Sequence, residues 1–310
     1  MIKDIRVINQ MVHKGTIGEY IKDFEYAFDK NIQDIAQRLK ADLAHSRIVL
    51  ISGPSSSGKT TFTLKLEKEL DGMGLEAETI SMDDFYLDRS KAPRKKDGTP
   101  DFETVYSLDL PEMRRCFEQF VKEGGMDMPH FSFKLGRRVE QRRHIPCREN
   151  TVLLVEGMHA LSDVVGEHIP NESARRIFIS IRNSLDIGDD VLLDSRNLRI
   201  LRRLIRDYKF RGSDPDHTLQ LWLDVIAGDI LYVEPFESRA DIMVNSFFPY
   251  EAGVLKPTAQ QMLTAIPRES IFYHQCRGIL ERLENVSQID TDLLPPTSLL
   301  REFVGDSVYY

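Results

Sequence analysis

The most constraining feature of this 310-residue chain is the eight-residue segment GPSSSGKT at residues 53–60. The segment matches the pattern G-x-x-x-x-G-K-[ST], follows an apolar, β-branched run at residues 47–52 and precedes a helical pattern at residues 62–70. In such a loop the glycines let successive N–H groups turn inward around phosphate oxygens, and the following helix presents its positive N-terminus to them. The segment therefore predicts a nucleoside triphosphate site between a strand and a helix.

The same chemistry assigns roles within the segment. Lys59 is expected to neutralise the β- and γ-phosphates, and the Thr60 hydroxyl is expected to ligate Mg²⁺. The other residues expected to bind the nucleotide are Gly53, Ser55, Ser56, Ser57, Gly58 and Thr61. The alternative is a chance match, which should occur in roughly 1% of chains of this length. The strand before the loop and the helix after it make that alternative the weaker one.

Strand and helix patterns alternate along the chain. The expected strands lie at residues 75–81, 151–156, 176–181 and 240–245, and the expected helices at residues 110–123, 192–211 and 218–231. Apolar strands without polar alternation, set between helices, indicate a parallel sheet covered on both faces. We expect an α/β fold of the P-loop NTPase type, with three α/β/α layers around a mostly parallel central sheet.

Two acidic motifs lie where expected strands end. MDDFY at residues 82–86 places Asp83 and Asp84 at the carboxyl edge of the sheet, where ligands bind in open α/β folds. A carboxylate there can accept the proton of an attacking hydroxyl, although a helix cap or a solvated turn explains the position equally well. VEGMH at residues 155–159 places Glu156 where an acid typically holds Mg²⁺ through water or orients the nucleophile.

A long basic helix is the fourth element. Arg199, Arg203 and Arg206 are spaced at i, i+4 and i+7 and therefore share one face. Other basic residues on the helix are Arg196, Arg202, Lys209 and Arg211. Such helices are usually solvated faces, but in an acidic chain with a phosphate loop the cluster favours a lid whose guanidinium groups close over the triphosphate.

Composition excludes several classes of protein. With 41 Lys and Arg against 49 Asp and Glu, the net charge of -8 argues against general affinity for nucleic acid or anionic membranes, but not against a local basic pocket. No run of 18 apolar residues occurs, and the first ten residues carry charges where a signal peptide would need its apolar stretch. The three cysteines have no C-x-x-C spacing. We therefore expect a cytoplasmic protein without membrane or nucleic-acid partners.

Six motifs follow one another in the order seen in the uridine kinase and phosphoribulokinase family. They are GPSSSGKT, MDDFY, DFETVYSLDL, MPHFSFKLGRR, VEGMH and RRLIRDYKFRG. The chain most resembles the uridine kinase-like nucleoside kinase branch. The resemblance covers residues 46–256, the expected P-loop kinase domain. It leaves a helical N-terminal extension at residues 1–45, where apolar spacing predicts a helix of about 25 residues, and a helical C-terminal extension at residues 257–310 packed on the kinase domain.

The resemblance implies further roles for individual residues. Asp83 stands at the general base that takes the proton from the acceptor hydroxyl, and Asp84 is the next candidate. Tyr86 would line the acceptor pocket, and Glu103 stands where uridine kinases place an aspartate that binds ribose hydroxyls. Phe131 matches the aromatic residue that stacks on the base, although alternation with Phe133 also suits a strand packed on a core. The matching lid residues, which contact phosphate or hold the acceptor, are Arg203, Arg206 and Arg211.

Two departures from the family pattern bear on the acceptor. Gly136 occupies the position where uridine kinases usually carry a pyrimidine-binding histidine, and Ser213 replaces a lid arginine. Loss of a hydrogen-bonding partner can change specificity by a large factor. The arginines at positions 137, 138, 142 and 143 either face an anionic acceptor or form an ordinary surface ribbon, which we favour slightly.

Together these features predict a kinase that uses ATP and Mg²⁺. The favoured acceptor is the 5′-hydroxyl of uridine or cytidine, a step of pyrimidine salvage. The first alternative is a kinase for another small alcohol, such as a sugar phosphate or a pantothenate-like acceptor. The second is a nucleotide-dependent regulatory or RNA-associated module, because this branch often carries domains resembling the front of threonyl-tRNA synthetase. The resemblance also implies a homodimer or homotetramer.

Overall fold

A five-stranded parallel sheet forms the centre of the protein. The computed structural model describes residues 2–133, 135–169 and 174–309. The strands follow the order β2 (Glu76–Ser81), β5 (Thr151–Glu156), β1 (Ile48–Ser52), β6 (Arg175–Ser180) and β9 (Ile242–Asn245). Every neighbouring pair is parallel. The four strands expected at residues 75–81, 151–156, 176–181 and 240–245 are confirmed, with ends that move by at most two residues.

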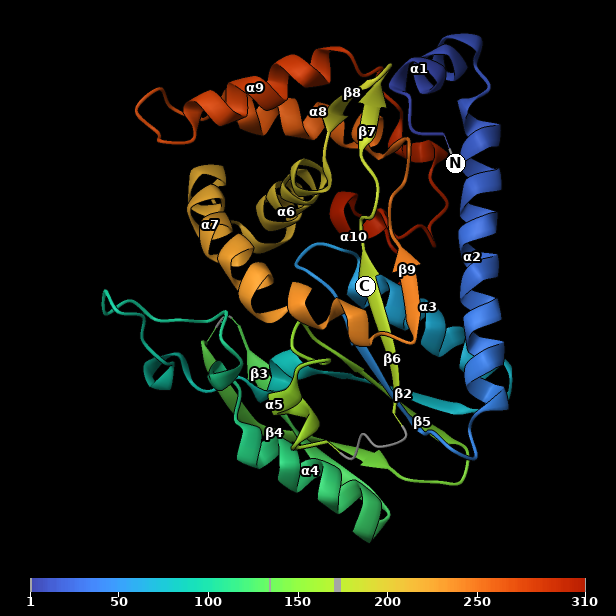
Figure 1. Ribbon diagram of the computed structural model, residues 1–310, viewed down its shortest axis with the longest axis vertical. Helices are drawn as coiled ribbons and strands as arrows, with labels where there is room; N and C mark the ends of the chain where they lie inside the picture. Colours follow the sequence, from blue (N-terminus) through green and yellow to red (C-terminus); the bar gives the residue numbers. More distant parts are fainter. Residues whose placement is uncertain (1, 134, 170–173, 310) are drawn as a thin grey trace.

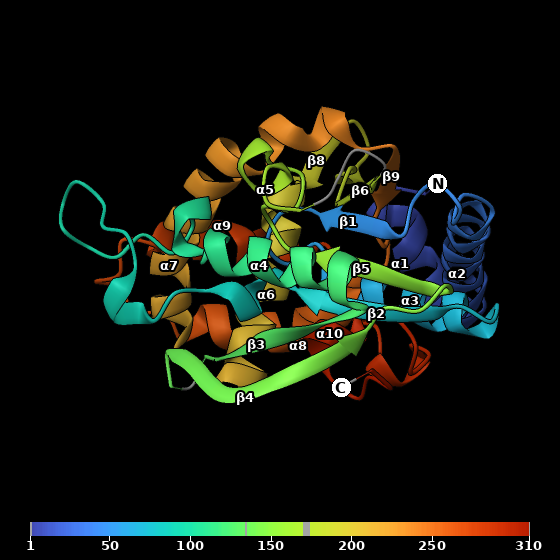
Figure 2. The same cartoon turned by 90° about the horizontal axis from the view of Figure 1, so that it is seen from below.

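Helices cover both faces of this sheet, because its strands are apolar on both sides. In β1, Val49 and Ile51 point into a core with α2 (Ile17–Ala41) and α3 (Lys59–Gly72). Ile48 and Leu50 point into a second core with α4 (Leu110–Glu123) and α5 (Asp163–Gly166). Figure 2 shows α4 and α2 on different sides of the strands. The predicted three-layer α/β/α fold is confirmed.

The N-terminal residues form two helices, α1 (Ile5–Lys14) and the 25-residue α2. Asp4 caps α1 by accepting from the Arg6 N–H at 2.9 Å, and Gly15 ends it in the left-handed conformation at φ 72°. The single apolar stripe of α2 packs along α3 and belongs to the same hydrophobic core as the sheet. This helix confirms the length expected from the spacing of the apolar residues.

Two antiparallel hairpins stand outside the main sheet. They are β3 (Gly125–Ser132) with β4 (Arg137–Pro146), and β7 (Leu185–Ile187) with β8 (Asp190–Leu193). The second hairpin corrects the helix expected at residues 192–211, whose first residues belong to β8. Asp194 caps the helix by accepting from the Asn197 N–H at 2.7 Å, so α6 spans Ser195–Arg211.

The remaining helices gather beside one end of the sheet. They are α7 (Pro215–Tyr232), α8 (Glu251–Thr264), α9 (Tyr273–Glu284) and α10 (Arg301–Val304). Short 3₁₀ turns are η1 (Met82–Phe85), η2 (Arg89–Lys91), η3 (Val105–Ser107), η4 (Glu234–Arg239) and η5 (Thr291–Leu293). The boundary expected at residue 257 falls inside α8. After α9 the chain returns to the centre of the molecule as α10 (Figure 1).

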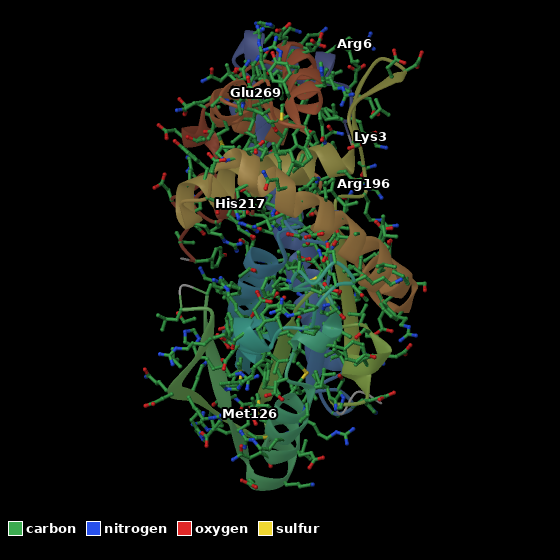
Figure 3. The ribbon with its side chains drawn as sticks, turned by 90° about the vertical axis from the view of Figure 1, so that its left-hand side faces the viewer. Lys3, Arg6, Met126, Arg196, His217 and Glu269 are labelled. Carbon is green, nitrogen blue, oxygen red and sulfur yellow. The ribbon has the colours of Figure 1, made fainter. Side chains whose placement is uncertain are left out.

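The β3–β4 hairpin and the helices α8 and α9 lie at opposite ends of the molecule's long axis (Figure 3). Met126, at the start of β3, and Glu269, between α8 and α9, lie at opposite ends (Figure 3). Within the described part of the chain, no helix combines the length and apolar character needed to cross a membrane.

Candidate active site

The phosphate loop joins β1 to the N-terminus of α3. Gly53 lies so close to β6 that a Cβ there would be 2.0 Å from the Ile179 carbonyl oxygen. Gly58 adopts φ 88°, which favours glycine, and α3 begins at the next residue. The Lys59 ammonium donates to the carbonyl oxygens of Gly53 at 2.7 Å and Pro54 at 3.1 Å. The loop predicted from the sequence therefore folds with two of its backbone carbonyl groups bound to the Lys59 ammonium.

The arginines of α6 contact the phosphate loop directly. Arg199 Nε donates to the Ser55 carbonyl oxygen at 2.8 Å, and Arg203 Nη1 donates to Ser55 Oγ at 2.9 Å. Arg202 is fully buried and donates to Glu251 at 2.6 Å and to the Ser246 carbonyl oxygen at 2.7 Å. Arg199 and Arg203 therefore bind the loop and Arg202 binds Glu251. The other arginines of the helix remain available to a ligand.

Asp207 gathers the arginines that remain partly exposed. Its Oδ1 accepts from Arg206 Nε at 2.9 Å and from Arg206 Nη2 at 2.8 Å, and it lies 3.4 Å from Arg211 Nη1. Its other oxygen lies 3.4 Å from Arg203 Nε. Because Asp207 is buried, it fixes these side chains near one another. Sequence reasoning missed this residue, although its i+4 spacing from Arg203 and to Arg211 was a usable signal.

The two aspartates after β2 have different surroundings. Asp84 Oδ1 accepts from the Phe131 N–H at 3.0 Å and lies 2.9 Å from His130 Nδ1, so it ties η1 to β3. Asp83 is exposed to solvent, and the protein atoms around its carboxyl raise its pKa by reducing its solvation. Its positive neighbours Lys59, Arg211 and Arg206 act against that rise. Of these two aspartates, Asp83 is therefore the one whose charge acts on Lys59 of the phosphate loop.

Glu156 is buried at the carboxyl end of β5. Its Oε1 accepts from Ser81 Oγ at 2.8 Å. Burial, together with the negative charge of Asp83, raises the pKa of Glu156 to about 7. A divalent cation would reverse this rise, and Mg²⁺ prefers oxygen donors such as the Glu156 carboxylate and the Thr60 hydroxyl. The donor set beside the loop therefore fits Mg²⁺.

The side expected to hold the acceptor carries an aromatic cluster. The ring centroids of Tyr86 and Phe131 are 5.8 Å apart, and those of Phe131 and Phe133 are 5.3 Å apart. Phe131, a residue of β3, is 5% exposed, whereas Phe133 is 54% exposed. Glu103 lies against Gly228 of α7, and its burial raises the pKa of the carboxyl to about 7. Pattern reasoning named Phe131, and only burial distinguishes it from the more exposed Phe133.

The basic ribbon on β4 is mostly neutralised by neighbouring acids. Arg138 donates to Asp109 at 2.9 Å, and Arg142 pairs with Glu112. Arg143 pairs with Glu78. These three side chains are engaged with protein carboxylates, which favours the ordinary surface ribbon over an anion site.

Gly136 turns the hairpin at φ 63°, and the Arg89 side chain fills the space beside it. A Cβ at Gly136 would lie 2.6 Å from Arg89 Cδ, and Arg89 Nη2 donates to the Phe133 carbonyl oxygen at 2.9 Å. An arginine therefore occupies the neighbourhood of the position where the resemblance implied a histidine.

A C-terminal residue also reaches the loop. Glu302 Oε2 accepts from Thr61 Oγ1 at 2.8 Å and from the Thr61 N–H at 3.3 Å. No sequence signal pointed to this carboxylate, because it lies 241 residues from its partner.

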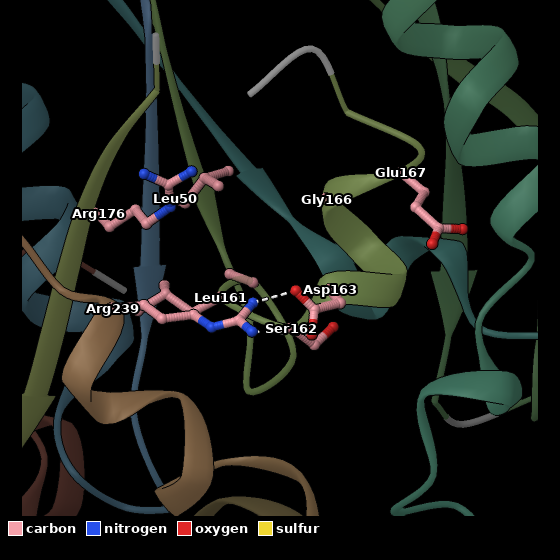
Figure 4. Close-up of a pocket in the computed structure, with 9 residues that line it drawn as sticks. Leu50, Leu161, Ser162, Asp163, Gly166, Glu167, Arg176 and Arg239 are labelled. Atoms are coloured by element: carbon pink, nitrogen blue, oxygen red, sulfur yellow. Dashed lines mark hydrogen bonds and ion pairs between the residues drawn. The ribbon is translucent and has the colours of Figure 1, made fainter. Parts of the chain in front are cut away.

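A separate cavity of about 600 Å³ lies between α5 and β6, lined by residues that include Leu161, Arg176 and Glu167 (Figure 4). The Arg239 guanidinium pairs with Asp163 at its edge, with 2.8 Å between Nη2 and Oδ2. None of the residues that line it belongs to the phosphate loop or to the MDDFY motif. The cavity is therefore separate from the phosphate loop.

The sequence of this chain is similar to those of known kinases. The model of the phosphoribulokinase/uridine kinase family matches residues 48–249. A uridine kinase of Deinococcus deserti is 26% identical over 225 residues, which cover 72% of this chain and 96% of that protein. A uridine kinase of Bacillus pumilus is 27% identical over 198 residues, covering 64% of this chain and 85% of that protein.

Among solved structures, one of a possible uridine kinase from Bacillus stearothermophilus is similar to 70% of this chain and covers 98% of its own, with a TM-score of 0.47 and 17% identity. The family model spans the phosphate loop, both acidic motifs, the hairpin and the α6 arginines. This chain therefore belongs to the phosphoribulokinase/uridine kinase family of ATP-dependent kinases.

Proposed function

We propose that this protein transfers the γ-phosphate of ATP to a hydroxyl of a nucleoside-like acceptor, with the 5′-hydroxyl of uridine or cytidine as the favoured target. The observation that carries the proposal is the position of Asp83, an exposed carboxylate in the electrostatic field of Lys59, Arg206 and Arg211. A base in the field of the phosphate-binding cations suits phosphoryl transfer to a hydroxyl. The uridine kinases of D. deserti and B. pumilus support the nucleoside class.

The two aspartates have separate roles in this proposal. Asp83 takes the proton of the acceptor hydroxyl. Asp84 holds the hairpin that carries the aromatic cluster, because its Oδ1 is already bound by the Phe131 N–H and His130. Asp84 is therefore a positioning residue, and the base assigned by the resemblance is the better supported of the two.

Cations of this chain bind the phosphates and stabilise the charge that spreads over them during transfer. Lys59 exchanges the carbonyl oxygens of Gly53 and Pro54 for phosphate oxygens. Arg206 and Arg211, held by Asp207, approach from α6. Mg²⁺, held by Thr60 and Glu156, would neutralise further phosphate charge.

The acceptor would bind between η1, the hairpin and α7. Tyr86 and the aromatic cluster supply an apolar wall, and Glu103 supplies a carboxyl group for ribose hydroxyls. Since burial raises the pKa of Glu103 to about 7, this group is able either to donate or to accept a hydrogen bond near neutral pH.

A second candidate is a kinase for a phosphorylated small alcohol. The observation that favours it is Arg89, whose side chain packs beside Gly136 where a base-binding histidine was expected. A guanidinium group recognises a phosphate better than a pyrimidine edge.

The experiment that separates the candidates is a panel of acceptors with ATP and Mg²⁺, read by the mass of the product. The panel contains uridine, cytidine, purine nucleosides and phosphorylated sugars. A gain of one phosphoryl group on uridine or cytidine supports the first candidate, and a gain on a sugar phosphate alone supports the second. ATP turnover without any phosphorylated acceptor contradicts both.

Matched variants test the roles of the aspartates. Asp83→Asn is expected to lower kcat by about 10² to 10⁴, since it removes general base catalysis. Asp84→Asn is expected to raise the KM for the acceptor more than it lowers kcat, because it loosens the hairpin. A normal kcat in Asp83→Asn would rule out Asp83 as the base.

A further inference from the structure

The C-terminal segment, residues 294–306, returns from α9 to the phosphate loop. Leu299 lies directly on the loop, since a Cβ at Gly58 would be 2.5 Å from Leu299 Cδ2. Lys65 of α3 donates to the Thr297 carbonyl oxygen at 2.6 Å. Ser298 donates to the buried carboxylate of Glu25 on α2. The segment is therefore held in contact with the phosphate loop, α3 and α2.

Glu302 places a carboxylate on the N-terminus of α3. The helix begins at Lys59, so the Thr61 N–H belongs to the first turn, ahead of the bond from the Phe62 N–H to the Gly58 carbonyl oxygen. Glu302 Oε2 accepts from this N–H at 3.3 Å and from the Thr61 hydroxyl at 2.8 Å. An anionic oxygen of the protein itself thus satisfies donors at the helix terminus that closes the phosphate loop.

These donors are among those that a nucleotide needs. The N–H groups of the loop and of the first turn of α3 form the cradle for the α- and β-phosphates. Carboxylate and phosphate oxygens are both anionic acceptors and bind the same kind of donor. The negative charge of Glu302 also acts on Lys59 and Arg211, the cations that face the phosphates. A bound triphosphate and Glu302 would therefore meet at the same end of the cradle with charges of the same sign.

The segment is also attached to the lid helix. Lys209 of α6 donates to the Val304 carbonyl oxygen at 2.9 Å. The Arg202 guanidinium lies over the Phe303 ring, 5.2 Å from its centroid. A displacement of Glu302 would therefore also act on α6, whose arginines contact the loop.

We propose that the C-terminal segment is an intramolecular competitor of the nucleotide, with the Glu302 carboxylate occupying phosphate-binding donors of α3 until ATP displaces it. The proposal rests on the proposed function in that ATP is the ligand of this loop. It adds that Glu302 sets the affinity for ATP, and that ATP binding loosens the contact of the segment with α3 and α6.

A purely structural role predicts a different result. If Glu302 only caps α3, its neutralisation lowers the melting temperature and leaves ATP affinity unchanged. If Glu302 instead helps to bind the nucleotide, its neutralisation weakens ATP binding. Competition alone predicts tighter binding when the charge is removed.

The test is the Kd for ATP of the full-length Glu302→Gln variant, measured by calorimetry with Mg²⁺ and without acceptor. The matched control is Glu281→Gln, which removes a charge from an exposed position on α9 in the same extension. If the docked carboxylate predominates by about ten to one, Glu302→Gln tightens the Kd about tenfold, since apparent affinity scales with the competent fraction. Glu281→Gln keeps the wild-type Kd. An unchanged or weaker Kd in Glu302→Gln, or no ATP binding by that variant, overturns the proposal.

Hydrogen exchange of the wild-type protein provides a second readout that does not depend on folding of the variant. Saturating ATP is expected to increase exchange at the amides of residues 299–305, and unchanged or slower exchange there contradicts the proposal. Failure of the proposed function is distinct, because it would appear as ATP binding without phosphorylation of any acceptor. Conversely, a phosphorylated acceptor together with an unchanged Kd in Glu302→Gln would remove only the competition.

Discussion

Glu156→Gln is the most informative single perturbation of this site. Glu156 is 7% exposed, and burial beside Asp83 raises the pKa of its carboxyl from 4.5 to about 7. Between these two values the folded state binds more protons than the unfolded state, so the free energy of unfolding falls as pH rises. The full difference corresponds to about 3 kcal/mol above pH 7. Gln keeps an oxygen that can accept from Ser81 Oγ and carries no charge, so the variant is expected to be more stable than wild type.

The size of this gain depends on pH. At pH 5.5 the unfolded carboxyl is mostly ionised and the folded one mostly protonated, so the variant is expected to be more stable by about 1 kcal/mol. At pH 8 the Glu156 carboxyl is ionised in both the folded and the unfolded wild type, and the stability gain of the variant is expected to grow to about 3 kcal/mol. Because the same substitution removes an expected Mg²⁺ ligand, we also expect it to lower turnover. A more stable but less active variant is typical of a charge kept for function.

The assay is urea unfolding in EDTA, without nucleotide, at pH 5.5 and pH 8. The control is Glu149→Gln, which removes a carboxylate from an exposed loop. The control is expected to follow the wild-type pH dependence. If the free energies of unfolding of Glu156→Gln and wild type differ by the same amount at both pH values, the burial argument for Glu156 is refuted.

Three further predictions concern the loop, the core and the acceptor wall. Arg202→Met is expected to destabilise the protein by about 3 to 5 kcal/mol in urea unfolding, because it leaves the buried carboxylate of Glu251 without its partner; restoration of stability by adding Glu251→Gln would confirm the cause, and an effect below about 1 kcal/mol would contradict it. Gly53→Ala is expected to abolish ATP binding in calorimetry, since its Cβ would lie 2.0 Å from the Ile179 carbonyl oxygen, and normal binding would show that the loop tolerates a shift. Phe133→Ala is expected to raise the KM for a nucleoside acceptor several-fold without lowering the melting temperature, because the ring is exposed; an unchanged KM would exclude this ring from the acceptor site.

Local sequence patterns determined the framework of this protein. GPSSSGKT between an apolar strand and a helical pattern specified the phosphate loop, since its backbone chemistry depends only on neighbouring residues. The unalternating strands specified a parallel sheet covered on both faces, and the order of six motifs specified the family. The β7–β8 hairpin was missed because its strands are only three and four residues long, too short for a periodic signal.

Tertiary structure decided which of several chemically equivalent side chains faces the ligand. Asp83 and Asp84 are adjacent in sequence, and only the distant β3 strand distinguishes them by binding Asp84. The arginines of α6 share a pattern, but burial assigns Arg202 to the core, whereas Arg206 pairs with Asp207. Glu302 reaches Thr61 across 241 residues. Spacing within one segment reports the face of a helix or strand, but it carries no information about which distant segment covers that face, and that packing assigns the roles.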